Sequence, residues 1–321
     1  MSKDQPLTSL SNEPSRTPAR WKIAAAFAAV YILWGSTYLA IRFAIETLPP
    51  FLMAGVRFMI AGSILYLWAR LRGTPRPLAV HWRSAAVIGA LLLLGGNGGV
   101  VWAQQFVPSS IAALIVATVP LWMVLIQSFW TRETFPSPTA WAGILLGLAG
   151  IWFLAAPDHA EVHGIPPLAA GVLLMASLSW ALGSLLTRRL TLPDSSPMSI
   201  GMEMLSGGVC LLSASLLAGE WGRFDPSAVS FTSLMGLVYL IVFGALVGFS
   251  CYIWIVKVTP PALSSTYAYV NPVVAVCLGW AFAGEELSAR TLTGAAIIIT
   301  AVFIITLANL RAAHNSPAAK F

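Results

Sequence analysis

The second half of the chain repeats the first, and this duplication constrains the fold more than any other feature. Matching residues are offset by 146 positions early in each copy and by 152 positions later. The recurring pairs are Trp34 and Trp180, Gly55 and Gly201, Arg57 and Glu203, Gly62 and Gly208, then Trp102 and Trp254, Pro108 and Pro260, Pro120 and Pro272, and Glu133 and Glu285. The change of offset fits an insertion in the loop near residues 219–230. The chain therefore contains two similar units.

The amino-acid composition indicates that these units lie in a membrane. Charged residues make up 9% of the 321-residue chain and hydrophobic residues 58%, whereas an average soluble domain has about 25% charged residues. So few charges could not cover the surface of a soluble protein of this length. The net charge of +6 is scattered over short loops, so the sequence predicts no nucleic-acid interface.

Ten mostly apolar runs are long enough for membrane-spanning helices, which need about 20 residues. We predict spans at residues 22–41, 51–69, 84–103, 109–130, 139–156, 166–186, 198–218, 231–253, 262–283 and 291–310. Helices are expected because backbone groups that face lipid must be hydrogen-bonded within their own segment. The predicted layout is a disordered tail at 1–21, a five-helix repeat at 22–156, a second at 166–310 and a tail at 311–321.

Lysine and arginine residues predict the orientation. With the N-terminus inside, fourteen of the eighteen lie on the inner side, and only Arg42, Arg223 and Arg290 lie in outer loops. The positive-inside rule then predicts that both termini are cytoplasmic. Each repeat has an odd number of spans, so the second must run opposite to the first. We therefore expect an all-α integral membrane protein with ten transmembrane helices in two inverted five-helix repeats, an arrangement found in secondary transporters.

Several motifs resemble those of one known family. They are Tyr31-Ile-Leu-Trp-Gly-Ser-Thr-Tyr38, Met53-Ala-Gly-Val-Arg-Phe58, Gly96-Asn-Gly98, Val107-Pro-Ser-Ser, Val116-Ala-Thr-Val-Pro120, Tyr267-Ala-Tyr-Val-Asn-Pro272 and Gly284-Glu285. Together they resemble the EamA family of the drug/metabolite transporter superfamily, over nearly the whole stretch between Trp21 and Arg311. The resemblance implies an inner-membrane transporter with a central cavity between the repeats and with the fifth and tenth spans at the periphery. Members mostly export amino acids, other metabolites or drugs.

Arg57 and Glu203 occupy equivalent positions in the two repeats with opposite charge. A charge near the centre of a span costs about 2.5–3.5 kcal/mol, so each should face protein or water. Arg57 lies about 9 Å below the outer end of its span at 1.5 Å per residue, and Glu203 lies near the inner end of its own. We therefore predict one charged group in each vestibule and no direct ion pair. The alternative is that both side chains snorkel to the nearest interface.

Glu203 is the acidic residue that lies most clearly inside a predicted span. It is therefore our candidate for the residue that couples transport to protons. Relatives in the EamA family often carry Glu where this chain has Gln104, in the run Trp102-Ala-Gln104-Gln105. That position therefore offers no acid for ion coupling here.

Further residues are candidates for lining the central cavity. Asn97, within Gly95-Gly-Asn-Gly-Gly99, either bonds to a neighbouring helix or lines the cavity. Pro120 and Pro272 each remove one backbone hydrogen bond. They predict either paired kinks beside the pathway, with Asn271 lending polar groups, or bends compensated by neighbouring helices. The deep aromatic residues, which could stack on a substrate, hold a cation or simply pack, are Trp34, Tyr38, Trp102, Trp180, Tyr267 and Tyr269.

The chemistry available in the spans argues against an enzyme. All four histidines lie in loops or in the tail, and no pair of acids lies within the spans, so we expect no catalytic residue, metal or cofactor. The sequence contains no phosphate-binding loop, so ATP is not expected to drive the protein directly.

We predict a secondary transporter that exports a small metabolite, amino acid or drug-like solute by alternating access. An importer of the same solutes and a passive channel without coupled turnover are the alternatives. The expected partners are the solute, the lipid bilayer and a coupling ion such as H⁺, with no nucleic acid. The sequence does not determine the oligomeric state.

Overall fold

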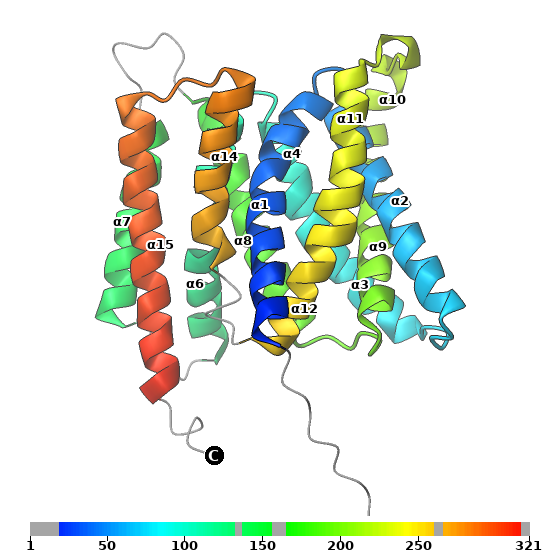
Figure 1. Cartoon of the computed structure of the whole chain (residues 1–321), viewed down its shortest axis with the longest axis horizontal. Coiled ribbons are helices and arrows are strands. Elements are labelled where there is room, and N and C mark those ends of the chain that lie inside the picture. Colours follow the sequence, from blue (N-terminus) through cyan, green and yellow to red (C-terminus); the bar gives the residue numbers. More distant parts are fainter. Residues whose placement is uncertain (1–18, 132–136, 156–164, 260–265, 316–321) are drawn as a thin grey trace, which may run out of the picture.

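The computed structural model describes residues 19–131, 137–155, 165–259 and 266–315, and within these ranges every regular element is a helix. The helices stand side by side in one bundle (Figure 1). In chain order they are α1 (Arg20–Ala44), α2 (Pro50–Leu71), α3 (Ala79–Gly89), η1 (Ala90–Gly98), α4 (Gly99–Ala103), α5 (Ser109–Val116), α6 (Val119–Thr131), α7 (Pro138–Ala155), α8 (Pro167–Thr187), α9 (Ser196–Leu217), α10 (Glu220–Arg223), η2 (Pro226–Ala228), α11 (Phe231–Tyr239), η3 (Leu240–Phe249), α12 (Ser250–Val258), α14 (Tyr267–Ala283) and α15 (Ala289–Asn315).

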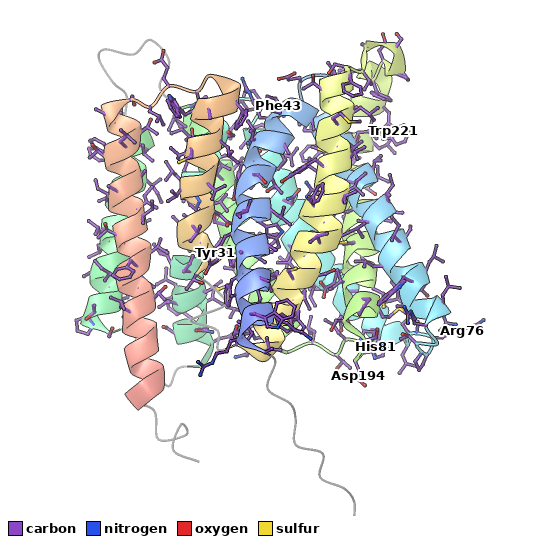
Figure 2. The ribbon with its side chains drawn as sticks, in the orientation of Figure 1. Tyr31, Phe43, Arg76, His81, Asp194 and Trp221 are labelled. Atoms are coloured by element: carbon purple, nitrogen blue, oxygen red, sulfur yellow. The ribbon has the colours of Figure 1, made fainter. Side chains whose placement is uncertain are left out.

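The two ends of the bundle differ. The start of α1 and the end of α15 lie at one end, which we call the terminal end, and the short helix α10 lies at the other, the α10 end (Figure 1). Figure 2 shows Arg76, His81 and Asp194 at the terminal end and Trp221 at the α10 end. In the orientation predicted from the basic residues, the terminal end is cytoplasmic.

Eight helical stretches in the described residues are long and apolar enough to cross a membrane. Two shorter apolar helices, Pro138–Leu154 and Val270–Ala283, correspond to the fifth and ninth predicted spans. The prediction of an all-helical multi-span protein is therefore confirmed, while the number of ten crossings stays a prediction. Some boundaries differ: α15 continues to Asn315 instead of ending at residue 310, and the predicted start of the ninth span, residue 262, lies outside the described residues.

The two repeats meet along α2 and α9, which are equivalent helices. Gly55 of α2 lies against Leu212 of α9, and Gly62 lies against Leu205 and Gly201. Residue numbers fall along α9 as they rise along α2, so the two helices are antiparallel, as inverted repeats require. A Cβ atom at Gly62 would lie 2.9 Å from the backbone nitrogen of Leu205 and 3.0 Å from the carbonyl oxygen of Gly201. Glycine therefore lets the two backbones pack in direct contact.

The equivalent helices α7 and α15 also pack against each other, at one edge of the bundle (Figure 1). Gly143 and Gly150 of α7 lie against Ile305 and Ile297 of α15, while Gly294 of α15 lies against Leu154 of α7. The small residues of α7 thus serve packing within the chain.

The third and eighth spans each contain a π-helical segment, and the two segments are equivalent. The repeat offset of 152 carries η1 onto residues 242–250, which nearly coincide with η3. Each segment carries a glycine against a tryptophan of the other repeat: Gly96 lies against Trp180, and Gly248 lies against Trp34. Segments of this kind are rare and occur frequently at functional sites, so these two mark the region in which a site is expected.

Replacing Gly62 by alanine tests the contact between α2 and α9. An added Cβ atom meets backbone that cannot rotate away, so Gly62→Ala should destabilise the protein by about 1–3 kcal/mol, as overpacking typically does. Gly171→Ala in α8 is the matched control, because nothing lies within 4 Å of a Cβ atom there. The melting temperature of the detergent-solubilised protein measures both. An unchanged melting temperature for Gly62→Ala would contradict the close contact.

Candidate functional site

A cavity lies between the two repeats and has a volume of about 880 Å³, including the space at its mouth. Eight residues that the sequence singled out line it: Trp34, Tyr38, Arg57, Asn97, Trp180, Tyr267, Asn271 and Pro272. The lining residues of α1 lie between positions 34 and 41, in its second half, and those of α2 are Arg57 and Phe58, near its start. Both stretches lie towards the α10 end, so the cavity occupies that half of the bundle.

Five aromatic side chains form a cluster at the deep end of the cavity. The ring centroid of Trp34 lies 4.8 Å from that of Tyr252, 5.4 Å from Tyr267, 5.9 Å from Trp180 and 6.0 Å from Phe249. On α1, α8 and η3, the cavity-lining residue farthest from the α10 end is a member of this cluster. Tyr252 is buried and does not line the cavity, so it lies behind the others. We call this cluster the aromatic floor.

The aromatic floor is tied to the π-helical segments. A π-helix shifts the backbone hydrogen-bond pattern. Side chains of the other repeat donate hydrogen bonds to carbonyl oxygens of each π-helical segment. The Nε1 of Trp34 donates to the carbonyl oxygen of Gly244 in η3 (3.2 Å), and the hydroxyl of Ser179 donates to the carbonyl oxygen of Leu91 in η1 (2.7 Å). Gly248 makes the first contact possible, because a Cβ atom there would lie 2.6 Å from the Trp34 nitrogen.

Among the described residues, Arg57 is the single charged one that lines the cavity. Its side chain is 4% exposed, and its guanidinium lies over the ring of Phe58 at 4.1 Å. Its Nε and Nη1 atoms are buried and have no hydrogen-bond partner among the described residues. Glu220, a buried acid in α10, accepts hydrogen bonds from the backbone N–H groups of Phe51 (3.2 Å) and Leu52 (2.8 Å) at the start of α2. A buried cation with two N–H-bearing atoms that lack a hydrogen-bond partner in the described part of the chain thus lines the cavity.

The two asparagines of the cavity differ in their contacts. The Oδ1 of Asn97, in η1, is buried and has no hydrogen-bond partner among the described residues. The amide nitrogen of Asn271 can reach the carbonyl oxygens of Tyr31 (3.2 Å) and Tyr267 (3.3 Å). Asn271 therefore joins α14 to α1, whereas Asn97 offers the cavity a free acceptor.

Glu203 is 1% exposed and does not line the cavity. Its backbone lies against Gly89, seven residues nearer the terminal end than Gly96, which lies against Trp180, so Glu203 lies on the far side of the aromatic floor. The antiparallel register of α2 and α9 explains this position. Arg57 and Glu203 lie on opposite sides of the helix crossing, about seven residues apart in depth, or about 10 Å at 1.5 Å per residue. The structure contains no ion pair between them.

Other predicted site residues lie elsewhere. Trp102, in α4, packs against Phe106 with the ring centroids 4.9 Å apart and the rings tilted, and it does not line the cavity. Pro120 also lies outside the lining, in the first turn of α6, where the fourth span is divided into α5 and α6, whereas Pro272 lies within the continuous helix α14. The side chain of Tyr269 lies outside the described residues.

Sequence reasoning missed two members of the aromatic floor, Phe249 and Tyr252. One signal was available for Phe249, because it occupies the repeat position of Asn97 at the offset of 152. The glycine before each, Gly96 and Gly248, recurs as well. These matches could have drawn attention to the eighth span, although they do not reveal that its side chains meet Trp34.

Two repeats of membrane-spanning helices around a shared cavity define the class of multi-pass membrane transporters. Residues 20–156 and 168–307 each match the EamA-like transporter family. The chain belongs to this family, and the resemblance predicted from the sequence motifs is confirmed.

Known proteins resemble this chain over most of its length. The Escherichia coli K12 inner membrane transporter YedA is 42% identical over 283 residues, which cover 88% of this chain and 90% of YedA. Protein PecM of Dickeya dadantii is 27% identical over 280 residues, covering 85% and 88% of the two chains. A solved crystal structure matches 93% of this chain and all of its own with a TM-score of 0.61 at 22% identity, which supports the fold. The relatives support a multi-pass protein of the inner membrane.

Removing the central ring of the aromatic floor should destabilise the protein. Trp34→Ala loses contacts with four aromatic rings and should cost about 3–5 kcal/mol, the range for buried large aromatic residues. Trp152→Ala is the matched control, since Trp152 is 72% exposed on the bundle surface. Thermal unfolding in detergent should show a clear drop for the first variant and little change for the second. Equal melting temperatures would mean that the cluster does not hold the two repeats together.

Proposed function

We propose that the protein is a secondary transporter that moves a small organic solute out of the cell by alternating access. The observation that carries this proposal is a cavity contributed by both antiparallel repeats and closed at its deep end by the aromatic floor. Two similar, inverted units can rock around one shared site, so that it faces each side of the membrane in turn. The proposal includes ten membrane crossings and cytoplasmic termini, and in that orientation the cavity faces outward.

The positions of Arg57 and Glu203 support this cycle. They are equivalent in the two repeats, yet one lines the cavity and the other is buried beyond the floor. If the repeats exchange conformations, Glu203 comes to line a cavity as Arg57 does now, on the opposite side of the membrane. Glu203 would then release to the cytoplasm a proton taken up from the outer side during the return of the carrier, and we propose it as the coupling residue.

A carrier fits the aromatic floor better than a passive channel does. A channel needs a continuous pathway, whereas here the packed rings of the aromatic floor lie on the side of the cavity that faces the terminal end. Import of the same solute by the same cycle is the remaining alternative. The direction of transport depends on the gradients and on the coupling, so it must be measured.

Counterflow tests the carrier mechanism. Purified protein is screened by thermal stabilisation against amino acids, nucleosides, sugars and cationic drugs, and stabilising compounds are loaded into proteoliposomes. A carrier exchanges internal unlabelled solute for external labelled solute, so transient accumulation above the equilibrium level is expected, with a rate that saturates. Linear, non-saturating flux without counterflow would support a channel instead.

Neutralising Glu203 tests the coupling. Glu203→Gln should reduce transport driven by a pH gradient by about tenfold or more, because a proton carrier is lost, while counterflow without a gradient continues. Glu46→Gln, which changes an exposed glutamate after α1, is the matched control and should behave as wild type. Unchanged dependence of the Glu203→Gln variant on the pH gradient would exclude Glu203 as the coupling residue.

A further inference from the structure

We propose that the solute carries a carboxylate, which Arg57 binds in the cavity, and an apolar or aromatic body, which rests against the aromatic floor. This inference rests on the proposed function, since it names the chemical class that the same cavity accepts.

The first step is the state of Arg57. Its side chain is buried, and its Nε and Nη1 atoms have no hydrogen-bond partner among the described residues. A buried ion without a partner costs far more than a paired one. Arg57 is also placed where a ligand can reach it, in the lining of the cavity. An anion entering the cavity would supply the missing partner.

The second step is the geometry that a guanidinium prefers. It presents five N–H donors in a planar fork that matches the two oxygens of a carboxylate. The Cζ atom of Arg57 lies 4.1 Å from the centroid of the Phe58 ring, and its Nε and Nη1 atoms have no hydrogen-bond partner among the described residues. Arg57 is the single charge among the described residues of the lining, so the cavity favours one negative charge and disfavours polyanions.

The third step concerns the acidic side chains of the protein that could pair with Arg57 in place of a solute. Both carboxylate oxygens of Glu220 accept backbone N–H groups at the start of α2. Glu203 lies beyond the aromatic floor, about 10 Å deeper along the helices at 1.5 Å per residue. Neither acid provides the partner in this conformation.

The other residues that line the cavity indicate which chemical groups the rest of the solute carries. Trp34, Trp180, Phe249 and Tyr267 present ring surface, and the remaining lining residues are mostly small or aliphatic. Aromatic and aliphatic groups of a solute pack well against such surfaces. The free Oδ1 of Asn97 can accept a hydrogen bond from an N–H or O–H of the solute.

Matched compounds test the charge requirement. The purified full-length protein is titrated with hexanoate, hexanamide and hexylamine, and with 3-phenylpropionate, 3-phenylpropionamide and 3-phenylpropylamine, while the melting temperature is followed. We expect the carboxylates to stabilise the protein, with the aromatic one effective at lower concentration. The apparent Kd of the amides should be at least about tenfold higher, the loss expected for a charge-assisted hydrogen bond. Stabilisation by neither carboxylate, or equal stabilisation by the amides, would overturn the proposal.

Two variants assign the effect to Arg57. Arg57→Gln should abolish the preference for carboxylate over amide, and Arg57→Lys should retain part of it because the charge remains. Arg42→Gln is the control, since Arg42 is exposed at the end of α1 and lies outside the cavity. A carboxylate preference that survives in Arg57→Gln would refute the role of Arg57.

A chemical measurement on the wild-type protein covers the case in which Arg57→Gln does not fold. Phenylglyoxal modifies arginine side chains, and peptide mass spectrometry follows each residue separately. 3-Phenylpropionate should slow the modification of Arg57 and leave that of Arg42 unchanged, whereas 3-phenylpropionamide should protect neither. Equal modification of Arg57 with and without the carboxylate would count against binding.

The outcomes separate this inference from the proposed function. Carboxylate binding at Arg57 without counterflow would refute the carrier mechanism and keep the binding site. Counterflow of a neutral or cationic solute that is independent of Arg57 would keep the carrier and overturn the inference.

Discussion

The direct backbone contact between α2 and α9 is the constraint on which the rest of the structure depends. Gly62 and Gly201 face each other in antiparallel helices, which relates the two repeats by an approximate two-fold axis at this crossing. The same relation places Arg57 on one side of the crossing and Glu203 on the other. Any larger side chain at Gly62 would separate the helices and move both charges away from the positions that the symmetry gives them. The positions of both charges in depth are therefore a consequence of two glycines.

The π-helical segments extend this symmetry to the centre of the bundle and then break it. Gly96 lies against Trp180 and Gly248 lies against Trp34, so the two tryptophans enter equivalent contacts. Trp34, however, gathers four aromatic neighbours, because Tyr252 and Tyr267 approach it from the second repeat. The floor therefore closes one half of the bundle while the other half contains the cavity. A structure made of two similar units thus has its cavity on one side only, as the proposed rocking carrier would in a single state.

Much of the fold could be predicted from the sequence, because its cause is local or periodic. Apolar runs give the spans, the basic residues predict the orientation, and the recurring Gly55 and Gly62 indicate where helices can approach closely. The site was only partly predictable. Whether Trp102 faces the cavity depends on the rotation of α4 about its axis, which hydropathy does not report in a helix surrounded by apolar neighbours. The division of the fourth span beside Pro120 and the arrival of Tyr252 behind Trp34 depend on packing between distant segments. Such contacts have no signature in either segment alone.

The difference in charge between Arg57 and Glu203 has a consequence for the proposed cycle. If the repeats exchange conformations, Arg57 passes from the cavity into a closed half, and a charge buried at that depth costs about 2.5–3.5 kcal/mol. A bound carboxylate would offset much of this cost, because Arg57 would enter the closed half as part of an ion pair. Glu203 moves the other way, from the closed half towards water, where ionisation becomes favourable. In the proposed export cycle, a bound carboxylate would therefore ease the conversion that moves Arg57 between the two halves, while Glu203 would release its proton to the cytoplasm when the carrier returns without solute. Symmetry would supply the motion, and the two unlike charges would determine which form of the carrier makes it.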